Sequence, residues 1–497
     1  MTAPTGTAST GIRPGRAVML VACISTLVVN ANTSAVSILL PSISVDLQTP
    51  VSVLQWAVTG YLLVGAAVIV TSGAMGDVFG RRRVFVAGLA LFVISCVLIA
   101  LAQTGLMVVL GRLIQGAAGS TILACGLSLL SVASSGPAQM RAVSLWGAAA
   151  AAGAAGGPVI GGVLNELTGW QGLFWIDAAV AAVCIPIAVR GVAESRDPNR
   201  PPTIDWAGTA LIAGVLVPFV FAMTEGSSWG WLSVPTLACL IVTVLAAVGF
   251  VVVERRVASP LIDLNVLRNR QLVTSTWVIF VGAGAIAALS FLLSLYFQDP
   301  ETLGFSSLTA GLAMLPLAAV VILVAPAVTP LAHRFGTRPV VLGGFLLLTV
   351  GFCVLVAVSP SWGYGVFLLP LLAIASGLSL TNGPATSVST SCVTADQVGQ
   401  ASGVSNMARY VGGAVMTAVV AGIYTTGIAD ATAEGVPHAD ALATGFSEAC
   451  IALAIFAAST IVFAVIAARR PQRPHVVDFA AAAASTTHTL PVAEQPA

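Results

Sequence analysis

Fourteen apolar segments, each long enough to cross a lipid bilayer, dominate the 497-residue sequence. A helix that crosses a hydrocarbon layer of about 30 Å needs about 20 residues. Charged residues make up 8% of the chain, against about 25% in soluble domains, so most of the chain must lie in lipid. The segments lack the alternation of barrel strands, which indicates an all-α integral membrane protein. They lie near residues 17–40, 52–73, 84–103, 106–133, 142–164, 172–189, 206–224, 233–253, 272–297, 308–332, 339–358, 363–382, 402–425 and 446–468.

The placement of arginine supports fourteen helices independently. The chain has no lysine, and eighteen of its twenty arginines fall in tails and loops on one side of a fourteen-helix arrangement. Loops on the other side carry acids instead, among them Asp46, Glu166 and Asp299. Because short cytoplasmic loops collect arginine, the segregation predicts a multi-pass plasma-membrane protein with both termini in the cytoplasm.

A repeated loop predicts how the helices are grouped. Phe79-Gly80 and Phe335-Gly336 occur 256 residues apart in similar surroundings, after the second and the tenth segment. The offset of eight segments indicates two six-helix bundles separated by two inserted helices. The predicted parts are a cytoplasmic N-terminal tail over 1–16, bundles over 17–189 and 272–468, inserted helices over 206–253, and a disordered cytoplasmic tail over 469–497.

The first copy of this loop is the strongest candidate motif. Glycines permit a tight turn between adjacent helices, and an aspartate there can pair with an arginine. A plain cluster of cytoplasmic arginines would not explain the glycine and aspartate spacing or the second copy. We interpret the motif as a gating loop formed by Gly73, Gly76, Asp77, Gly80, Arg81, Arg82 and Arg83, with Gly336 and Arg338 at the second copy.

The fourth segment contains a permanently charged residue, Arg112. A central arginine costs roughly 2.5–3.5 kcal/mol on insertion, so something must offset the charge. One interpretation is an arginine near the helix end whose side chain reaches the headgroups. In the other, Arg112 faces an aqueous cavity with Gln115 and Gly116, where it biases a nearby protonation site or binds an anionic group.

Glycines recur every four residues in the fifth segment. Gly153, Gly157 and Gly161 would lie on one face of a helix, where a neighbouring backbone can approach closely. Pro158 and Gly162 add a kink and a second small residue. Generic helix packing would explain the spacing alone, but the proline and paired glycines favour a hinge or a helix crossing that moves.

These motifs resemble those of the major facilitator superfamily, and more narrowly its fourteen-helix drug:proton antiporters, over about residues 17–468. The loop from Gly73 to Arg83 resembles the signature loop of the superfamily. Arg112-x-x-Gln115-Gly116 resembles its helix-4 proton-transfer motif, and Gly157 to Gly162 resembles the helix-5 motif of exporters. Similar stretches also lie at Phe174 to Asp177 and from Gly399 to Gly413, which includes Arg409. The resemblance implies the major facilitator fold, with two six-helix bundles around a midplane cavity plus two extra central helices.

Asn32 departs from the pattern of this family. The family usually carries an acidic residue there in helix 1, upstream of a proline that corresponds to Pro41. Asparagine cannot titrate, and we expect the remaining carboxylates near membrane depth, Asp177, Glu225 and Glu448, close to the outer face. Because cationic drugs are usually matched by a buried carboxylate, the sequence favours a neutral, zwitterionic or anionic amphiphilic substrate.

Residues and resemblance together predict a secondary active efflux transporter. We expect it to export an amphiphilic drug, antibiotic or metabolite across the plasma membrane in exchange for protons, with the proton gradient as its energy source. We expect no cofactor, metal or nucleic acid, no enzymatic activity, and a monomer in the lipid bilayer, because no site motif for these partners appears and the net charge is +1. The alternatives are an importer or facilitator of a small metabolite and a non-transporting membrane sensor on a transporter scaffold.

Overall fold

A computed structural model describes residues 14–133, 136–196, 203–257, 260–262, 264–394 and 397–467. Within these ranges the chain is helical, without strands, and fourteen helices are long and apolar enough to cross a membrane. The predicted helix number and the all-α class are therefore confirmed. Most of the two predicted tails, 1–13 and 468–497, lies outside the described residues.

The N-terminal half of the bundle, called the N-half here, contains six of these spans. Its helices are α1 (Pro14–Asp46), α2 (Val51–Leu54), α3 (Trp56–Phe79), α4 (Arg81–Ala100), α5 (Gly105–Ala133), α6 (Gly136–Thr168) and α7 (Gln171–Gly191), with α2 and α3 forming one span. The end of the bundle where α1 begins is called the terminus side. The end where α1 finishes is called the distal side.

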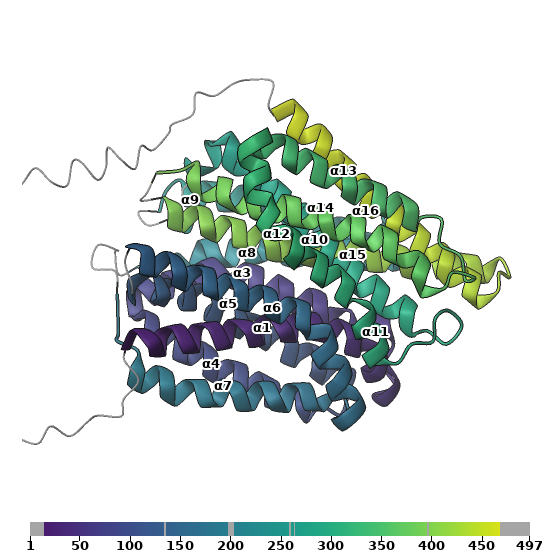
Figure 1. Ribbon diagram of the computed structural model, residues 1–497, viewed down its shortest axis with the longest axis horizontal. Helices are drawn as coiled ribbons and strands as arrows, with labels where there is room; N and C mark the ends of the chain where they lie inside the picture. Colours follow the sequence, from purple (N-terminus) through teal and green to yellow (C-terminus); the bar gives the residue numbers. More distant parts are fainter. Residues whose placement is uncertain are drawn as a thin grey trace, which may run out of the picture.

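The inserted pair and the C-terminal half, called the C-half, follow. The inserted helices are α8 (Trp206–Trp229) and α9 (Val234–Glu254), and a short 3₁₀ helix η1 (Val266–Arg268) precedes the C-half. The C-half comprises α10 (Arg270–Gln298), α11 (Ser307–Ala313), α12 (Leu315–Phe335), α13 (Thr337–Leu355), α14 (Tyr364–Ser391), α15 (Val398–Ala433) and α16 (His438–Ala467), with α11 and α12 in one span. Figure 1 shows the N-half in purple and blue beside the C-half in green and yellow.

One helix, α14, runs nine residues further than the sequence predicted, to Ser391 instead of 382. The extension is rich in Ser and Thr, which lowers its hydropathy. Those hydroxyls bond to carbonyls of the preceding turn, as Thr386 Oγ1 does to the Asn382 carbonyl at 2.8 Å, so their hydrogen bonds are made within the helix. A polar stretch of α14 therefore lies inside a membrane span.

The two copies of the repeated loop form the same turn. Gly80 lies between α3 and α4 with φ +112°, and Gly336 lies between α12 and α13 with φ +90°. Both values are in the left-handed region that favours glycine. Each glycine N–H donates to the carbonyl four residues earlier, at 3.0 Å and 2.9 Å. The sequence repeat thus corresponds to a repeated single-residue corner between antiparallel helices.

The glycine face of α6 lies directly on α1. A Cβ added at Gly153 would overlap the Leu27 carbonyl, and one added at Gly157 would overlap the Ala31 carbonyl. The opposite face of the same motif meets the C-half, because a Cβ at Gly162 would lie 2.6 Å from the Ser307 carbonyl oxygen. The fifth span therefore packs closely against both halves, which only residues without side chains permit.

The inserted helices differ in how much protein surrounds them. α8 packs on α3, where Thr71 Oγ1 lies 2.8 Å from Thr209 Oγ1 and the rings of Trp56 and Phe221 are 4.3 Å apart. α9 lies outside α8, and its apolar side chains such as Leu245 are exposed. In a bilayer these side chains would meet lipid, so the pair widens the bundle rather than separating its halves.

Candidate functional site

Arg112 lies fully enclosed in the N-half. Its side chain is 0% exposed, and its Nε donates to the Ala57 carbonyl at 2.9 Å. Nη1 donates to Asn32 Oδ1 at 2.6 Å and to Gln115 Oε1, and the guanidinium carbon lies 4.1 Å from the centre of the Tyr61 ring. The interpretation in which Arg112 reaches the headgroups is wrong, because acceptors from α1, α3 and α5 hold the charge inside the bundle. In this conformation Arg112 does not face an aqueous cavity either.

Asn32 links this arginine to a buried acid, Asp177. The Asn32 amide accepts from Arg112 with its oxygen and donates from Nδ2 to Asp177 Oδ2 at 2.7 Å. Asp177 lies six residues, or about 9 Å, inside the distal end of α7, and its side chain is 5% exposed. Asp177 therefore lies in the distal third of α7, and its side chain is buried inside the N-half rather than exposed at the end of the helix. A buried acid is present on α7, and Asn32 of α1 joins it to the arginine.

The order of the three groups determines the electrostatics. A buried cation and a buried anion form a net neutral set, whereas removing either charge leaves the other uncompensated at high cost. A carboxyl is also the member of the set that can exchange a proton. The arrangement can therefore hold a proton inside the N-half, at the carboxyl of Asp177.

The predicted gating loop forms its described contacts within the N-half. Arg81 Nη2 pairs with Asp77 Oδ1 at 2.8 Å, and Arg82 and Arg83 lie 3.7 Å from Glu194, in the segment after α7. The Arg82 backbone N–H also donates to Glu194 Oε1 at 3.0 Å. Together these contacts fasten the α3–α4 corner to the end of α7. A gating role for the loop stays a prediction.

Comparisons with known proteins agree with this arrangement. The model of the Major Facilitator Superfamily matches residues 22–417. The chain belongs to this superfamily. Its helices superpose on an auto-inhibited POT family peptide transporter with a TM-score of 0.66 at 14% identity, covering 93% of this chain and 98% of that one. The chain is thus a multi-pass membrane protein with the transporter fold of the superfamily.

Two relatives with stated activities are similar over most of their length. The tetracenomycin C resistance and export protein of Streptomyces glaucescens is 30% identical over 413 residues, which cover 83% of this chain and 75% of that protein. The cephamycin export protein CmcT of Amycolatopsis lactamdurans is 29% identical over 462 residues, covering 92% and 91%. This superfamily member therefore resembles exporters over most of its sequence.

The halves of this superfamily member are joined by polar contacts on the distal side. Asn165 of α6 donates to Ser307 of α11 at 3.0 Å, and within its own half it donates to Ser42 of α1 at 2.9 Å. Gln298 of α10 donates to the Ile38 carbonyl of α1 at 3.0 Å. These contacts lie together at the distal end of the bundle, and we call the set the distal latch. The described conformation is closed on the distal side.

Replacing Asn165 with alanine is expected to favour opening of the distal side. The change removes the hydrogen bond to Ser307, which joins the two halves and contributes about 1 kcal/mol, so the closed population should fall by roughly fivefold relative to the open one. Spin labels at the exposed Leu167 of α6 and Leu312 of α11 would report the change as a shift to longer distances.

Thr168→Ala is the matched control for this variant. Thr168 lies on the same helix, but its hydroxyl bonds only to the Leu164 carbonyl of α6 at 2.9 Å. The distribution of distances between the two spin labels in Thr168→Ala should equal that of the unmodified protein. Equal distributions for Asn165→Ala and Thr168→Ala would show that the latch does not hold the halves together.

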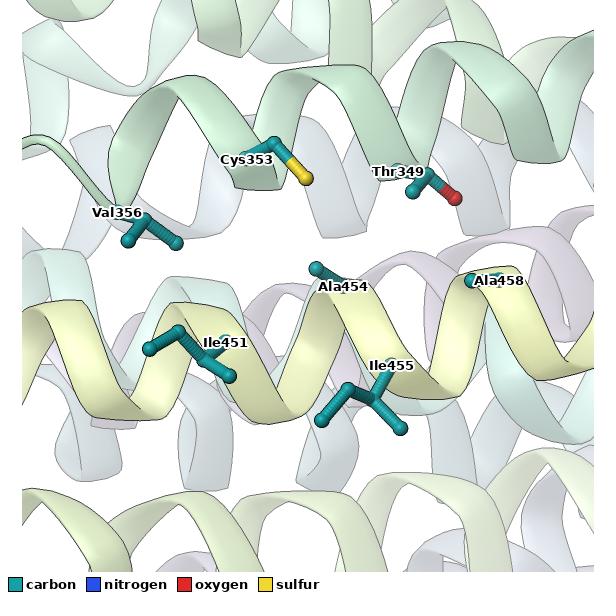
Figure 2. Close-up of a pocket in the computed structure, with 7 residues that line it drawn as sticks. All are labelled: Thr349, Cys353, Val356, Ile451, Ala454, Ile455 and Ala458. Atoms are coloured by element: carbon teal, nitrogen blue, oxygen red, sulfur yellow. The ribbon is translucent and has the colours of Figure 1, made fainter.

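A groove between α13 and α16 lies apart from these polar groups. Figure 2 shows its lining, and its volume is about 410 Å³. The one hydroxyl in it, on Thr349, bonds to the Phe345 carbonyl of its own helix at 2.8 Å. An apolar groove without free polar groups suits a lipid chain better than an amphiphile that must be recognised. It is lined by Thr349, Cys353, Val356, Ile451, Ala454, Ile455 and Ala458.

The sequence did not predict the bond between Asn32 and Asp177 or the distal latch. An acid inside an otherwise apolar segment was the available signal for Asp177, since such residues mark functional sites in membrane proteins. The latch residues carry no comparable signal. Serine, asparagine and glutamine are common near helix ends, and only the packing of α1, α6, α10 and α11 brings these together.

Proposed function

We propose that this superfamily member is a proton-coupled exporter of an amphiphilic drug, antibiotic or metabolite, with Asp177 as the residue that carries the coupled proton. The observation that carries the proposal is the Arg112–Asn32–Asp177 set, because the Asn32 amide joins a buried carboxyl to the buried Arg112. The proton gradient is the energy source, and no cofactor takes part.

Export is favoured over the alternatives by the relatives. Proteins named for resistance and export match this chain over most of its length, and none of the relatives described above is named as an importer or a sensor. The segregation of arginine supports a plasma-membrane orientation with both termini in the cytoplasm. In that orientation the distal latch closes the outer face, and the described state receives substrate from the cytoplasm.

Protonation of Asp177 supplies a physical link to the movement of the halves. With the carboxylate charged, the Asn32 amide is held between an anion and a cation by charge-assisted hydrogen bonds. Once Asp177 is neutral, Arg112 remains as a buried cation without an anionic partner. Its Nη2 already has no acceptor among the described residues, so no other hydrogen bond offsets the lost charge. The closed packing of α1, α5 and α7 is then less favourable, so the proton biases the rocking of the halves.

Transport by the purified protein in liposomes with an acidic lumen tests the proposal. We expect uptake of an amphiphilic dye from a panel of anilinonaphthalene sulfonate, N-phenylnaphthylamine and ethidium, together with loss of luminal protons. A protonophore should abolish the uptake. Dye uptake that depends on neither the gradient nor the protonophore would contradict proton exchange. If the folded protein takes up none of the dyes, that result would contradict export of amphiphiles.

A further inference from the structure

A second arginine, Arg409 of α15, lies deep in the C-half. It lies eleven residues, or about 16 Å, from the start of α15 at Val398. One turn further on, Gly412 packs on the carbonyl of Phe280, in the middle third of α10. Arg409 is therefore inside the membrane span, where an arginine is costly and is expected to have a partner.

Among the described residues, this arginine has no anionic partner. In the part of the chain that the structure describes, no carboxylate lies within 4.0 Å of the guanidinium, and its one hydrogen bond, to Thr386 Oγ1 of α14, is long at 3.5 Å. Arg112, by contrast, has acceptors from three residues. A guanidinium has five N–H donors, so most of those on Arg409 are unused.

Other polar groups gather around this arginine. Ser402, Asn406 and Arg409 share one half-buried face of α15, at the spacing of successive helical turns. From α14, Thr386 is exposed, and Asn382 has a buried oxygen without a hydrogen-bond partner. A polar, partly open face within a span is expected to meet water rather than lipid. The cluster combines a permanent cation with amide and hydroxyl groups, which suits a carboxylate or sulfonate.

The cluster also lies close to the proton-holding set without contacting it. Tyr410, next to Arg409, reaches α3, where a Cβ added at Gly65 would lie 2.6 Å from its ring. Tyr61, one turn earlier on α3, lies under the guanidinium of Arg112. Two tyrosines therefore separate an unpaired cation in the C-half from the neutral Arg112–Asp177 set in the N-half.

We infer that Arg409, with Thr386, Asn382 and Asn406, binds the anionic headgroup of the transported amphiphile. This inference rests on the proposed function and narrows its substrate to an organic anion, carried with its apolar part between the halves. A cationic drug would face Arg409 without a free carboxylate beside it, since Asp177 is bonded to Asn32. Anions are therefore selected and cations rejected by the same residue.

Two dyes that share a ring system separate charge recognition from apolar binding. Anilinonaphthalene sulfonate carries an anionic group, and N-phenylnaphthylamine is the same scaffold without it. We expect Arg409→Gln, in the purified full-length protein, to weaken binding of the sulfonate by about tenfold or more and to leave N-phenylnaphthylamine within about twofold. Arg409→Lys should retain most of the affinity, because it keeps the charge.

Arg334→Gln is the matched control, because it removes the same charge from an exposed position at the end of α12. Its affinities should be unchanged, and thermal unfolding checks that each variant is folded. The inference is overturned if the sulfonate binds the unmodified protein no better than N-phenylnaphthylamine. Equal loss of both dyes in Arg409→Gln, or sulfonate affinity that does not depend on Arg409, would overturn it as well.

Failure of this inference differs from failure of the proposed function. Proton-driven transport of ethidium or N-phenylnaphthylamine, with sulfonate binding indifferent to Arg409, would leave an exporter whose substrate is not an anion. Sulfonate binding that requires Arg409, with no dye moved by a proton gradient, would leave the anion site in a protein that is not a proton-coupled exporter.

Discussion

Asp177→Asn is expected to abolish proton-driven transport while the protein still exchanges substrate across the membrane. An amide cannot take up or release a proton, but it can accept the hydrogen bond that Asn32 now donates to the carboxylate at 2.7 Å. In liposomes, gradient-driven dye uptake should fall to the background of empty liposomes. Counterflow of labelled against unlabelled dye should continue, because that exchange needs no net movement of protons.

Glu448→Gln is the matched control for this variant. Glu448 is an exposed acid of α16, so its removal tests whether any lost carboxyl in a span would have the same effect. Its gradient-driven uptake should equal that of the unmodified protein. Full proton-driven uptake by Asp177→Asn would show that another group carries the proton, and loss of both uptake and counterflow would point to a structural role of Asp177.

A reciprocal exchange sharpens this test. Asn32→Asp combined with Asp177→Asn moves the acid from α7 to α1 and restores one carboxyl and one amide at the same hydrogen bond. The acid then stands next to Arg112, which already bonds to residue 32 at 2.6 Å. We expect the double variant to regain part of the proton-driven uptake that the single variant loses. No recovery would mean that the carboxyl must lie on α7.

Much of the fold could be predicted because its signals are local. Hydropathy over a single segment decides whether a helix can cross the membrane, and all fourteen predicted segments correspond to helices. The corner at Gly80 and its copy at Gly336 could be recognised because a tight turn between helices needs glycine within a few residues. The spacing of Gly153, Gly157 and Gly161 likewise fixes which residues share a face.

The candidate site could be predicted only in part, because it joins residues far apart in the sequence. Arg112 was found, since a charge in an apolar segment is visible at once. Arg112 and Asn32 are 80 residues apart in the sequence, and Asn32 and Asp177 are 145 residues apart. Only the packing of α1, α5 and α7 brings the three together. Read alone, Asn32 indicated a missing acid. In the structure it is the amide between a cation and an acid.

Gly157→Val is expected to destabilise the close packing of α6 on α1. The added side chain would overlap the Ala31 carbonyl and the Ser34 hydroxyl of α1, and a backbone carbonyl cannot move aside as a flexible side chain can. Overpacking of this kind costs about 1–3 kcal/mol, so the thermal unfolding midpoint in detergent should fall by a few degrees.

Gly147→Val on the same helix is the control, because an added Cβ there meets nothing within 4 Å. It should unfold at the temperature of the unmodified protein. The displaced Ala31 is next to Asn32, so pushing α1 away from α6 also moves the amide that joins Arg112 to Asp177. Gly157→Val should therefore lose proton-driven uptake even at temperatures where it remains folded. Equal stability and uptake of the two valine variants would show that α1 and α6 do not need their close approach, and that the glycine face is not what fixes Asn32 between its two charged partners.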